Sequence, residues 1–456
     1  MQSIASLHEY ITMATIEQLY QIYLQHPVIS TDTRKIAAGS LFFALKGEKF
    51  DANAFAAQAI ATGAAYAVID NAAYQLSEKY LLVDDVLTTL QDLAIHHRRQ
   101  LTIPVIGLTG TNGKTTTKEL INAVLSQRFK TLATQGNLNN HIGVPLTILS
   151  INPLHQMAVI EMGANHQKEI ALLCTIAQPT HGLITNVGKA HLEGFGGVEG
   201  VKKGKGELYD YLQQNKGVAF INSNSPTLME MQAARKFETP PVFYGDDIDD
   251  LVSGEITENA PLLTLVWTNN TSGESYTVKT QLTGAYNLDN ILAAICIGIY
   301  FKLPANEINK GIEGYQPKNN RSQIVQTGTN TLICDYYNAN PSSMAVAIEN
   351  IDKLQATRKV LILGDMFELG EESPAEHENV IKKALGIPVN ERIFIGAAFH
   401  QAHLGMDDEP KSTGSTIFYP TAEGAIDALK TNPVKNSTVL IKGSRGMALE
   451  RLVELF

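Results

Sequence analysis

The sequence predicts an α/β protein of three domains: a small N-terminal α/β domain, a central domain built on a doubly wound, mostly parallel sheet, and a C-terminal Rossmann-like α/β domain. Three observations lead to this prediction. The chain has 456 residues, which is too long for one ordinary hydrophobic core. Apolar runs of strand length alternate with helical patterns along most of the chain. The alternation restarts near residue 316, so we expect domains at 1–88, 89–315 and 316–456.

The expected strands are short apolar runs bounded by polar or glycine-rich segments. In the first domain they lie at 41–45, 66–69 and 80–83, with a helix at 52–64 and a connecting helix at 87–101. In the central domain they lie at 105–108, 157–162, 182–187 and 218–222, followed by an antiparallel hairpin within 253–282 that contains Trp267 as a packing residue. In the third domain they lie at 331–337, 359–365, 392–398, 416–420 and 438–444, with helices at 342–354 and 421–430.

Composition limits the classes of function. The net charge of −10 and the pI of about 5.7 argue against nucleic acid as a main partner. Cys174, Cys296 and Cys334 are widely spaced in apolar runs, so we expect buried thiols in a reducing compartment. The stretch 52–69 is interrupted by polar residues and falls short of the about 18 apolar residues that span a bilayer. Residues 1–20 lack the pattern of a signal peptide, and we expect a cytoplasmic protein without membrane insertion.

The stretch 105-VIGLTGTNGKTTTKEL-120 has the properties of a phosphate-binding loop. Gly110 and Gly113 allow the backbone to turn sharply and to direct several N–H groups at one point. Lys114 supplies a cation, Thr115 supplies a hydroxyl for Mg²⁺, and a helix at 114–127 directs its positive end at the anion. The pattern departs from the strict P-loop at Leu108, and an ordinary glycine-rich turn is the alternative. The stretch predicts binding of a nucleoside triphosphate without naming the reaction.

Polar residues follow several of the expected strands, where ligands of open α/β sheets bind. Glu161 could hold Mg²⁺ next to the phosphate loop, and His191 follows the next strand. An amide cluster lies at 137–140, and Asp335 with the loops 363–373 and 441–447 faces the site of the third domain. The alternatives are solvated charges, Asx turns and, at Asn340-Pro341, a helix start. These features indicate a Mg-nucleotide-dependent enzyme, and a phosphate-driven motor or switch is the other interpretation.

Together these stretches resemble the Mur ligase family, and the match covers nearly the whole chain. The family's phosphate loop reads T-G-T-N-G-K-T-T, as 109–116 do, and its patterns G-N-x-N-N-x-x-G-x-P, E-M-G-A-N-H and A-H-L-E-G-F-G are met by 136–145, 161–166 and 190–196. The most specific strings, 335-DYYNANP-341 and 363-LGDMFELG-370, are similar to the branch that adds D-Ala-D-Ala. The D-N-P-R string of the diaminopimelate-adding branch is absent.

The resemblance implies that the central domain binds ATP and two Mg²⁺ ions. Thr115 and Glu161 would hold one ion and His191 the other, with Lys205 as a carbamylated ligand; Lys202 and Lys203 lie close to it in sequence. Lys114, His191 and Lys205 would be catalytic, and Tyr286 replaces the family's usual histidine in 284-GAYNLDN-290. The ATP-binding residues that the resemblance implies are Gly110, Thr111, Asn112, Gly113, Lys114, Thr115, Thr116, Asn287, Asn290, Arg321 and Asp335.

The resemblance also implies how the substrates are divided among the domains. The first domain would hold the UDP end, through 31-TDTR-34 and 39-GSLFFALKG-47, although 51-DANAF-55 departs from the family's D-G-H-x-F. The third domain would hold the dipeptide, with the 365–370 loop as a further candidate. The substrate-binding residues implied are Thr31, Asp32, Thr33, Arg34, Lys46, Asn137, Asn140, Asn338 and Asn340.

The implied activity is ATP-dependent amide formation. The terminal carboxylate of UDP-MurNAc-tripeptide would attack ATP to give an acyl phosphate, and the amine of D-Ala-D-Ala would displace the phosphate. Both partners are small molecules, and we expect a monomer. A related ligase, folylpolyglutamate synthetase, is the nearest alternative, but it should lack the first-domain signature and D-x-Y-N-A-N-P. The third residue of the tripeptide, lysine or diaminopimelate, stays open.

Overall fold

The computed structural model describes residues 13–259, 262–318, 320–406 and 413–456. The prediction that residues 1–20 are not a signal peptide falls mostly on residues 1–12, which lie outside the described residues. The chain divides into two compact units. The first contains the residues up to Gly107 together with Phe129–Gly163 and Glu169–His181, and the second contains Leu108–Arg128, Ala164–Lys168 and Gly182–Phe456.

The first unit contains a four-stranded parallel sheet with the order β1-β2-β5-β6. Its strands are β1 (Ile29–Ser30), β2 (Leu41–Phe43), β5 (Tyr66–Ile69) and β6 (Tyr80–Leu82). The predicted helix at 52–64 is a 3-10 turn (Ala52–Phe55) followed by α2 (Ala56–Thr62). The small hairpin β3 (Lys46–Gly47) and β4 (Phe50–Asp51) was not predicted, because its strands have two residues each. Asp85 caps α3 (Val86–Arg99), the predicted connecting helix, and Thr15 caps α1 (Ile16–Gln25).

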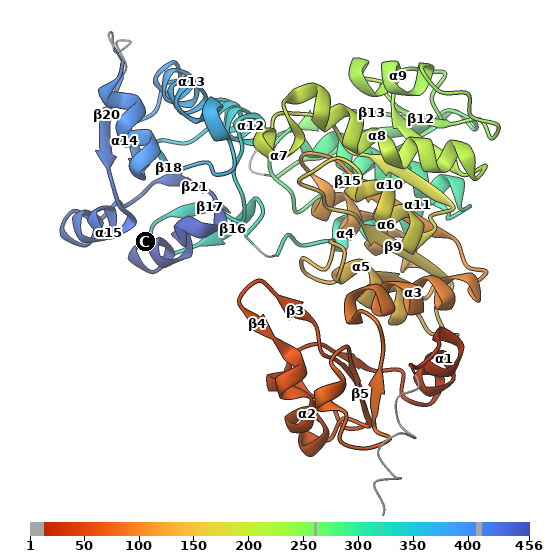
Figure 1. Cartoon of the computed structure of the whole chain (residues 1–456). Coiled ribbons are helices and arrows are strands. Elements are labelled where there is room, and N and C mark those ends of the chain that lie inside the picture. The colour runs from red at the N-terminus through yellow and green to blue at the C-terminus, as the bar shows by residue number, and fades with distance from the viewer. Residues whose placement is uncertain (1–12, 260–261, 319, 407–412) are drawn as a thin grey trace, which may run out of the picture. The chain divides into compact units, whose positions relative to one another are not determined.

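A nine-stranded sheet has the order β15-β14-β13-β12-β11-β10-β7-β9-β8, and its strands β9, β12, β13 and β15 are labelled in Figure 1. It contains β7 (Val105–Thr109), β8 (Thr131–Ala133), β9 (Met157–Glu161), β10 (His181–Ile184), β11 (Val218–Asn222) and β12 (Val242–Gly245). The predicted hairpin is instead three antiparallel strands, β13 (Val252–Glu258), β14 (Thr264–Asn269) and β15 (Glu274–Lys279), and β13 pairs with β12 so that they extend the sheet. Trp267 is fully buried, as predicted, and its indole N–H donates to Asn309.

Eight helices of the described residues accompany these strands. They are α4 (Lys114–Leu125), α5 (Gly143–Leu149), α6 (Glu169–Ala177), α7 (Leu192–Phe195), α8 (Val198–Gln214), α9 (Pro226–Ala233), α10 (Asn287–Tyr300) and α11 (Ala305–Gly314). Ser225 caps α9 through its side chain. No helix in the described ranges is long and apolar enough to cross a membrane. The three cysteines are buried and unbridged, as expected.

The third sheet has the order β16-β17-β21-β18-β19-β20 and is parallel except for β16. Its strands are β16 (Gln323–Gln326), β17 (Thr331–Asp335), β18 (Lys359–Gly364), β19 (Glu391–Ile395), β20 (Ser415–Tyr419) and β21 (Thr438–Lys442). Helices α12 (Pro341–Lys353), α13 (Ser373–Leu385), α14 (Ala397–Leu404) and α15 (Ala422–Thr431) alternate with them. The order of these elements confirms the predicted alternation.

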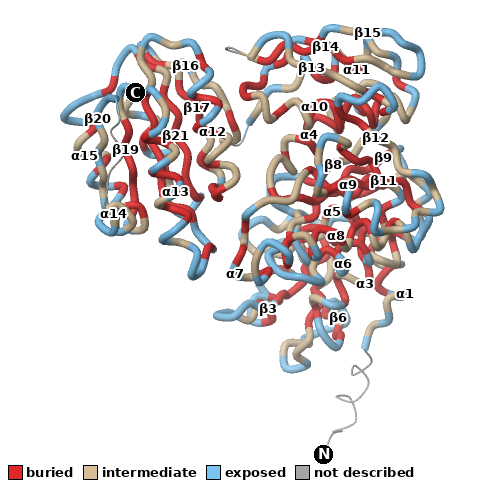
Figure 2. The backbone as a smooth tube through the Cα atoms, turned by 90° about the horizontal axis from the view of Figure 1, so that it is seen from above, coloured by how far each residue is buried: buried red, intermediate tan, exposed pale blue. Residues whose placement is uncertain are grey.

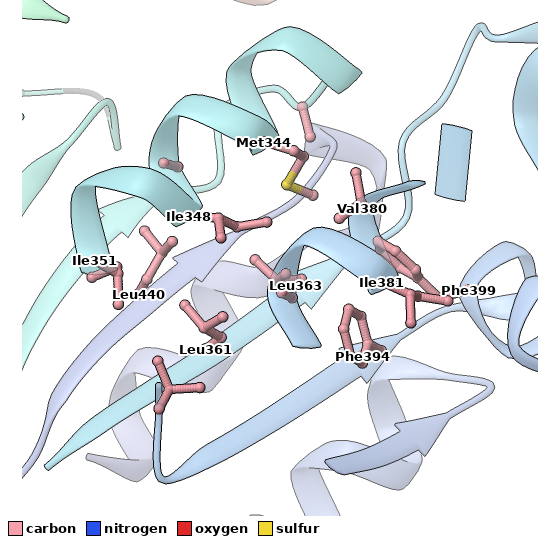
Figure 3. Packing of buried hydrophobic residues seen from close by; sticks show 14 of the residues in the cluster. Met344, Ile348, Ile351, Leu361, Leu363, Val380, Ile381, Phe394, Phe399 and Leu440 are labelled. Atoms are coloured by element: carbon pink, nitrogen blue, oxygen red, sulfur yellow. The ribbon is translucent and has the colours of Figure 1, made fainter. Parts of the chain in front are cut away.

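Both faces of the third sheet are buried, which explains its continuous apolar strands. Leu361 and Leu363 pack with Met344 and Ile348 of α12 and with Ile381 of α13 (Figure 3). The alternate residues of the same strand, Val360 and Ile362, pack on the opposite face with Leu429 and Leu452. Strands β17, β19 and β21 are therefore mostly red in Figure 2, whereas the edge strands β16 and β20 are not. The core fixes the carboxyl ends of β17, β18 and β21, from which the polar loops emerge.

Candidate active site

The predicted phosphate loop connects β7 to α4, and two of its glycines are sterically required. Gly110 has φ +147°, and a Cβ there would lie 2.0 Å from Oγ1 of Thr185. Gly113 has φ +79° and begins α4, and a Cβ there would lie 2.6 Å from Oδ1 of Asn290. Side chains at these positions would both strain the backbone and collide with neighbours. The loop therefore adopts a strand-to-helix turn suited to an anion at the N-terminus of α4.

The amine of Lys114 lies on this loop. Its Nζ donates to the carbonyl oxygens of Gly110 at 2.7 Å and Thr111 at 2.9 Å. Thr115 is buried in the first turn of α4, and Thr116 is half-buried beside it. The structure thus brings together the loop residues 110–114 around one cation, which is the arrangement that the sequence predicts for a triphosphate.

A segment that the sequence analysis missed holds this loop in place. The side chain of Asn186 accepts a hydrogen bond from the N–H of Asn112 at 2.9 Å and donates to the carbonyl of the same residue at 3.1 Å. Oγ1 of Thr185 donates to that carbonyl at 2.6 Å. We predicted a strand over 182–187, but β10 ends at Ile184, because the next residues bond to the phosphate loop and leave the sheet. Thr-Asn directly after an apolar strand was the available signal.

The amides of Asn287 and Asn290 form a ladder between helices. Asn290 accepts from Oγ1 of Thr117 at 2.9 Å and donates to Oδ1 of Asn287 at 3.0 Å, and Asn287 donates to the carbonyl of Thr283 at 2.8 Å. Both asparagines are buried. The ladder joins the first turns of α4 and α10, so these residues also have a structural role beside the ATP contact expected of them.

Glu161 ends β9 in the first unit, and the amide cluster supports it. Nδ2 of Asn139 donates to Oε1 of Glu161 at 2.8 Å, which fixes the orientation of the carboxylate. Asn140 accepts from the N–H groups of Ile142 and Gly143 at the start of α5, so the Asx-turn interpretation holds for it. Asn137 is exposed. Of the three asparagines, the one that was not predicted as a site residue, Asn139, contacts the candidate metal ligand.

In the second unit, His191 directly precedes α7 and Lys205 lies on α8. His191 has φ +52°, and its Nδ1 pairs with the carboxylate of Glu368. Burial lowers the pKa of this histidine, and the Glu368 carboxylate opposes that shift. The side chain of Lys205 is almost fully buried; its Nζ donates to the carbonyl of Ala164 at 3.2 Å and lies 4.9 Å from the centroid of the Phe195 ring. Glu368 was not a predicted site residue, although its loop was.

The first-domain candidates form two separate groups. The exposed guanidinium of Arg34 donates to the carboxylate of Asp32 at 2.8 Å, and this hydrogen bond lowers the pKa of Asp32 to about 2. Arg34 lies in a 3-10 turn (Thr33–Lys35) that Asp32 caps, and Thr31 precedes Asp32. Lys46 lies elsewhere, on the hairpin, with its Nζ 2.8 Å from Oδ1 of Asp70.

The residues 51-DANAF-55, which depart from the family's D-G-H-x-F, contribute to a group of hydrogen bonds around Asn53. The fully buried Asn53 donates to the carboxylates of Asp51 and Asp70 at 2.7 Å each, and its Oδ1 accepts from the N–H of Asp70. Although burial opposes ionisation, hydrogen bonds from Lys46 and Asn53 hold the pKa of Asp70 below its usual value. Asn53 thus joins the hairpin to the end of β5 and helps to hold the partner of Lys46.

The candidates of the third domain lie at the carboxyl ends of β17 and β21. Oδ2 of Asp335 accepts from Nζ of Lys442 at 2.6 Å, and Oδ1 accepts from the N–H of Ser322 at 3.2 Å. The carbonyl of Asn338 also accepts from Lys442 at 3.3 Å. Asn340 caps α12, which confirms the helix-start interpretation, and its Nδ2 also donates to Oδ1 of Asn112 at 2.8 Å. Lys442 is a buried functional candidate that the sequence analysis did not single out.

Two buried residues, Asp365 and His377, fix the conformation of the loop 365–370. Asp365 accepts from the N–H groups of Ala398 and Phe399, so it caps α14, and the predicted strand 392–398 ends at Ile395 because Gly396 (φ +129°) turns the chain there. The fully buried His377 accepts from the N–H of Met366 through Nε2 at 3.0 Å. Asp365 therefore shapes the loop, and Phe367, Glu368 and Gly370 are its exposed residues.

A phosphate loop between a parallel strand and a helix is typical of α/β enzymes that bind nucleotides, and comparison with known proteins identifies the family. Residues 27–101 match the Mur ligase family, catalytic domain; 108–298 match the Mur ligase middle domain; and 320–445 match the Mur ligase, glutamate ligase domain. The chain belongs to the Mur ligase family.

The similar proteins have a common description. UDP-N-acetylmuramoyl-tripeptide–D-alanyl-D-alanine ligase of Escherichia coli (strain K12) is 36% identical, over 93% of this chain and 92% of its own. A crystal structure of MurF from Acinetobacter baumannii superposes with a TM-score of 0.84 at 30% identity, covering 96% of this chain and 98% of that one. MurF ligase from Thermotoga maritima in complex with ADP has a TM-score of 0.81 at 25% identity, covering 94% and 96%. These matches confirm the predicted three-domain α/β fold.

Proposed function

We propose that this chain is an ATP-dependent amide ligase that joins D-Ala-D-Ala to the terminal carboxylate of UDP-MurNAc-tripeptide. The product is UDP-MurNAc-pentapeptide, a peptidoglycan precursor. The observation that carries the proposal is the near-complete match to ligases of this description at up to 36% identity, in a chain whose phosphate loop is intact. The strings at 335–341 and 363–370 lie at the carboxyl ends of β17 and β18, the two strands that flank β21 in the third sheet, and they support the choice of the dipeptide as acceptor.

The reaction has two steps. An oxygen of the tripeptide carboxylate attacks the γ-phosphorus of ATP, and ADP leaves, which gives an acyl phosphate. The amine of D-Ala-D-Ala then attacks the acyl carbon, loses a proton and displaces inorganic phosphate. Activation is required because a carboxylate is a poor acyl donor at neutral pH. We propose that Lys114, on the phosphate loop, stabilises negative charge on the transferred phosphoryl group, because such stabilisation supplies much of the catalysis in phosphoryl transfer.

The family resemblance implies Mg²⁺, and part of the donor set fits this ion. Mg²⁺ prefers oxygen ligands, and the Thr115 hydroxyl and the Glu161 carboxylate, oriented by Asn139, are of that kind. The ammonium of Lys205 does not fit a cation, but its carbamate would fit as a carboxylate-like ligand. We propose that Thr115 and Glu161 hold one ion and that His191 and carbamylated Lys205 contribute to a second. When bound, Mg²⁺ would neutralise charge on the phosphates.

We also propose the other contacts with ATP and the two substrates that the sequence predicts. The ATP contacts are the loop 110–116 with Asn287, Asn290, Arg321 and Asp335. The contacts of the nucleotide-sugar substrate are Thr31 to Arg34, Lys46, Asn137 and Asn140, and those of the dipeptide are Asn338 and Asn340. We also propose domain boundaries near residues 88 and 315, a monomer, and a cytoplasmic location, where ATP is available.

The test is phosphate release from Mg-ATP by the purified protein. UDP-MurNAc-tripeptides ending in lysine or diaminopimelate are supplied with and without D-Ala-D-Ala, next to a folate-plus-glutamate control, and products are weighed by mass spectrometry. Release that needs both cell-wall substrates and yields the pentapeptide supports the proposal. Release with folate and glutamate would assign the chain to the folate ligases, and release independent of either pair would indicate a switch or motor. Lys114→Met should abolish release, whereas Lys310→Met, on α11, should not.

A further inference from the structure

Two arginines of the second unit contact one tyrosine ring, which lies two residues beyond the carboxyl end of β17. The guanidinium carbon of Arg321 lies 3.8 Å from the centroid of the Tyr337 ring, and that of Arg445 lies 5.2 Å from it. Nη1 of Arg445 is also 3.5 Å from the hydroxyl of Tyr337. Tyr337 belongs to the string 335-DYYNANP-341, and Arg445 follows β21, whose last residue is Lys442. Both arginines therefore lie beside the strand ends that carry the third-domain candidates.

Neither guanidinium is neutralised by a carboxylate in the part of the chain that the structure describes. The nearby acid, Asp335, is bound to Lys442 at 2.6 Å. Nε of Arg321 is buried and makes no hydrogen bond in the described structure. Two uncompensated cations on one ring produce a local field that attracts an anion. The proposed ATP contact accounts for Arg321 but leaves Arg445 without a function.

The backbone around Arg445 is held firmly, although its side chain is exposed. Oγ of Ser444 accepts from the N–H of Phe367 at 3.0 Å, and the N–H of Ser444 donates to the carbonyl of Asp365 at 3.1 Å. A Cβ on Gly446 would lie 2.7 Å from the ring of Phe367, so this ring packs directly on the backbone beside Arg445. Phe367 is 47% exposed. An exposed apolar ring and an uncompensated guanidinium thus lie side by side on a fixed loop pair.

We propose that Arg445 binds the terminal carboxylate of the D-Ala-D-Ala acceptor and that Phe367 contacts its methyl groups. This inference rests on the proposed function. The dipeptide has one amine, which the reaction consumes, and one carboxylate, which stays charged throughout. A planar guanidinium recognises a carboxylate through two parallel hydrogen bonds, and an adjacent apolar ring suits an alanine side chain. A phosphate of the nucleotide is also an anion that a guanidinium can bind, but it has no apolar group that could contact the Phe367 ring.

The experiment compares D-Ala-D-Ala with D-alanyl-D-alaninamide, which lacks the charge, in the wild-type protein and in Arg445→Met. In the wild type, kcat/KM for the amide should be about 10- to 100-fold lower than kcat/KM for D-Ala-D-Ala, which is the range expected for the loss of a charged hydrogen-bond pair. In Arg445→Met, kcat/KM for D-Ala-D-Ala should fall by a similar factor. Replacing D-Ala-D-Ala by the amide should then lower kcat/KM by no more than about threefold further. The KM values for ATP and the nucleotide-sugar substrate should stay within about twofold of wild type.

The control variant is Arg451→Met, which removes another exposed arginine of the same domain, paired with Glu423 at 3.0 Å. It should behave as the wild type toward both acceptors. Equal use of the acid and the amide by the wild type would overturn the inference while leaving the proposed function intact. A rise in the KM for ATP in Arg445→Met, with unchanged acceptor discrimination, would assign Arg445 to a phosphate instead. If the wild type does not ligate D-Ala-D-Ala at all, the proposed function itself fails.

Discussion

Nζ of Lys442 lies 2.6 Å from Oδ2 of Asp335, and the lysine side chain is only 2% exposed. Removing one partner of a buried ion pair leaves the other charge uncompensated. The resulting loss of folding free energy is larger than the net stabilisation that the intact pair provides. We expect Lys442→Met to destabilise the third domain by about 3 kcal/mol, the low end of the usual range because Asp335 keeps some contact with water. If Asp335 contacts ATP, the KM for ATP should rise as well.

Hydrogen exchange of the backbone amides in β17 and β21 measures this loss of stability in the third domain separately from the rest of the protein. Lys430→Met is the matched control, because its ammonium lies 3.5 Å from Asp427 and both side chains are mostly exposed. Such a surface pair contributes less than about 0.5 kcal/mol. Similar exchange rates in the two variants would contradict the role given to the buried pair.

The side chain of Asn186 makes both of its hydrogen bonds with the backbone of Asn112, in the phosphate loop. Asn186→Ala removes both, so the loop should lose its fixed shape before nucleotide binds. We expect ADP to bind about 10-fold more weakly, equivalent to the loss of one or two ordinary hydrogen bonds. Titration calorimetry with ADP measures the change. In the control, Asn215→Ala removes a bond from an exposed asparagine to the carbonyl of Tyr211 and should leave ADP affinity unchanged.

The sequence was most informative where a residue type has one strong physical reason for its place. Gly110 and Gly113 were predicted as turn glycines, and the structure shows that no larger residue fits. The apolar strands of the third sheet were located to within a few residues, because both of its faces are buried. Asn340 was predicted as a substrate-binding residue with a helix start as the alternative, and the structure confirms the helix start because Asn340 caps α12.

The errors have equally specific causes. The run 182–187 looks like one strand, but Thr185 and Asn186 bond to a loop more than 70 residues away in sequence, which no local pattern reveals. The hairpin at Lys46 has two residues in each strand, too few for periodicity to detect. Lys442 appears in sequence as an ordinary strand-end lysine, and only its pairing with Asp335 shows that it is buried. Predictions failed where the partner of a side chain was distant.

The pKa of His181 is lowered to about 4 by burial. An unfolded chain binds a proton at this residue as the pH falls below about 6.5, whereas the native protein stays neutral until about pH 4. The unfolded state is therefore favoured as the pH falls through this window, and the free energy of unfolding should decrease by up to about 1.4 kcal/mol per pH unit from this residue. Burial lowers the pKa of His97 in the same direction.

Urea unfolding between pH 4 and 8 measures this dependence. His181→Gln should have a shallower slope below about pH 6.5 than the wild type, and the two curves should run parallel above about pH 7.5. Identical slopes throughout the range would show that His181 is protonated in the native protein as readily as in the unfolded one.

Lys205 is the lysine best placed to carry a carbamate among the three in 202-KKGKGEL-208. It is 2% exposed, whereas Lys202 pairs with Glu230 at 2.7 Å and Lys203 is exposed. A buried amine that becomes neutral reacts with CO₂, and the resulting carbamate removes a cation from the neighbourhood of His191, where the Lys205 charge lowers the pKa of the histidine. We expect a carbamate signal in ¹³C NMR of protein equilibrated with ¹³C-bicarbonate, absent in Lys205→Met and kept in Lys203→Met. Ligase activity should be lost only in the first variant. A signal that persists in Lys205→Met would move the modification to another lysine, and an active Lys205→Met would remove it from the proposed metal site.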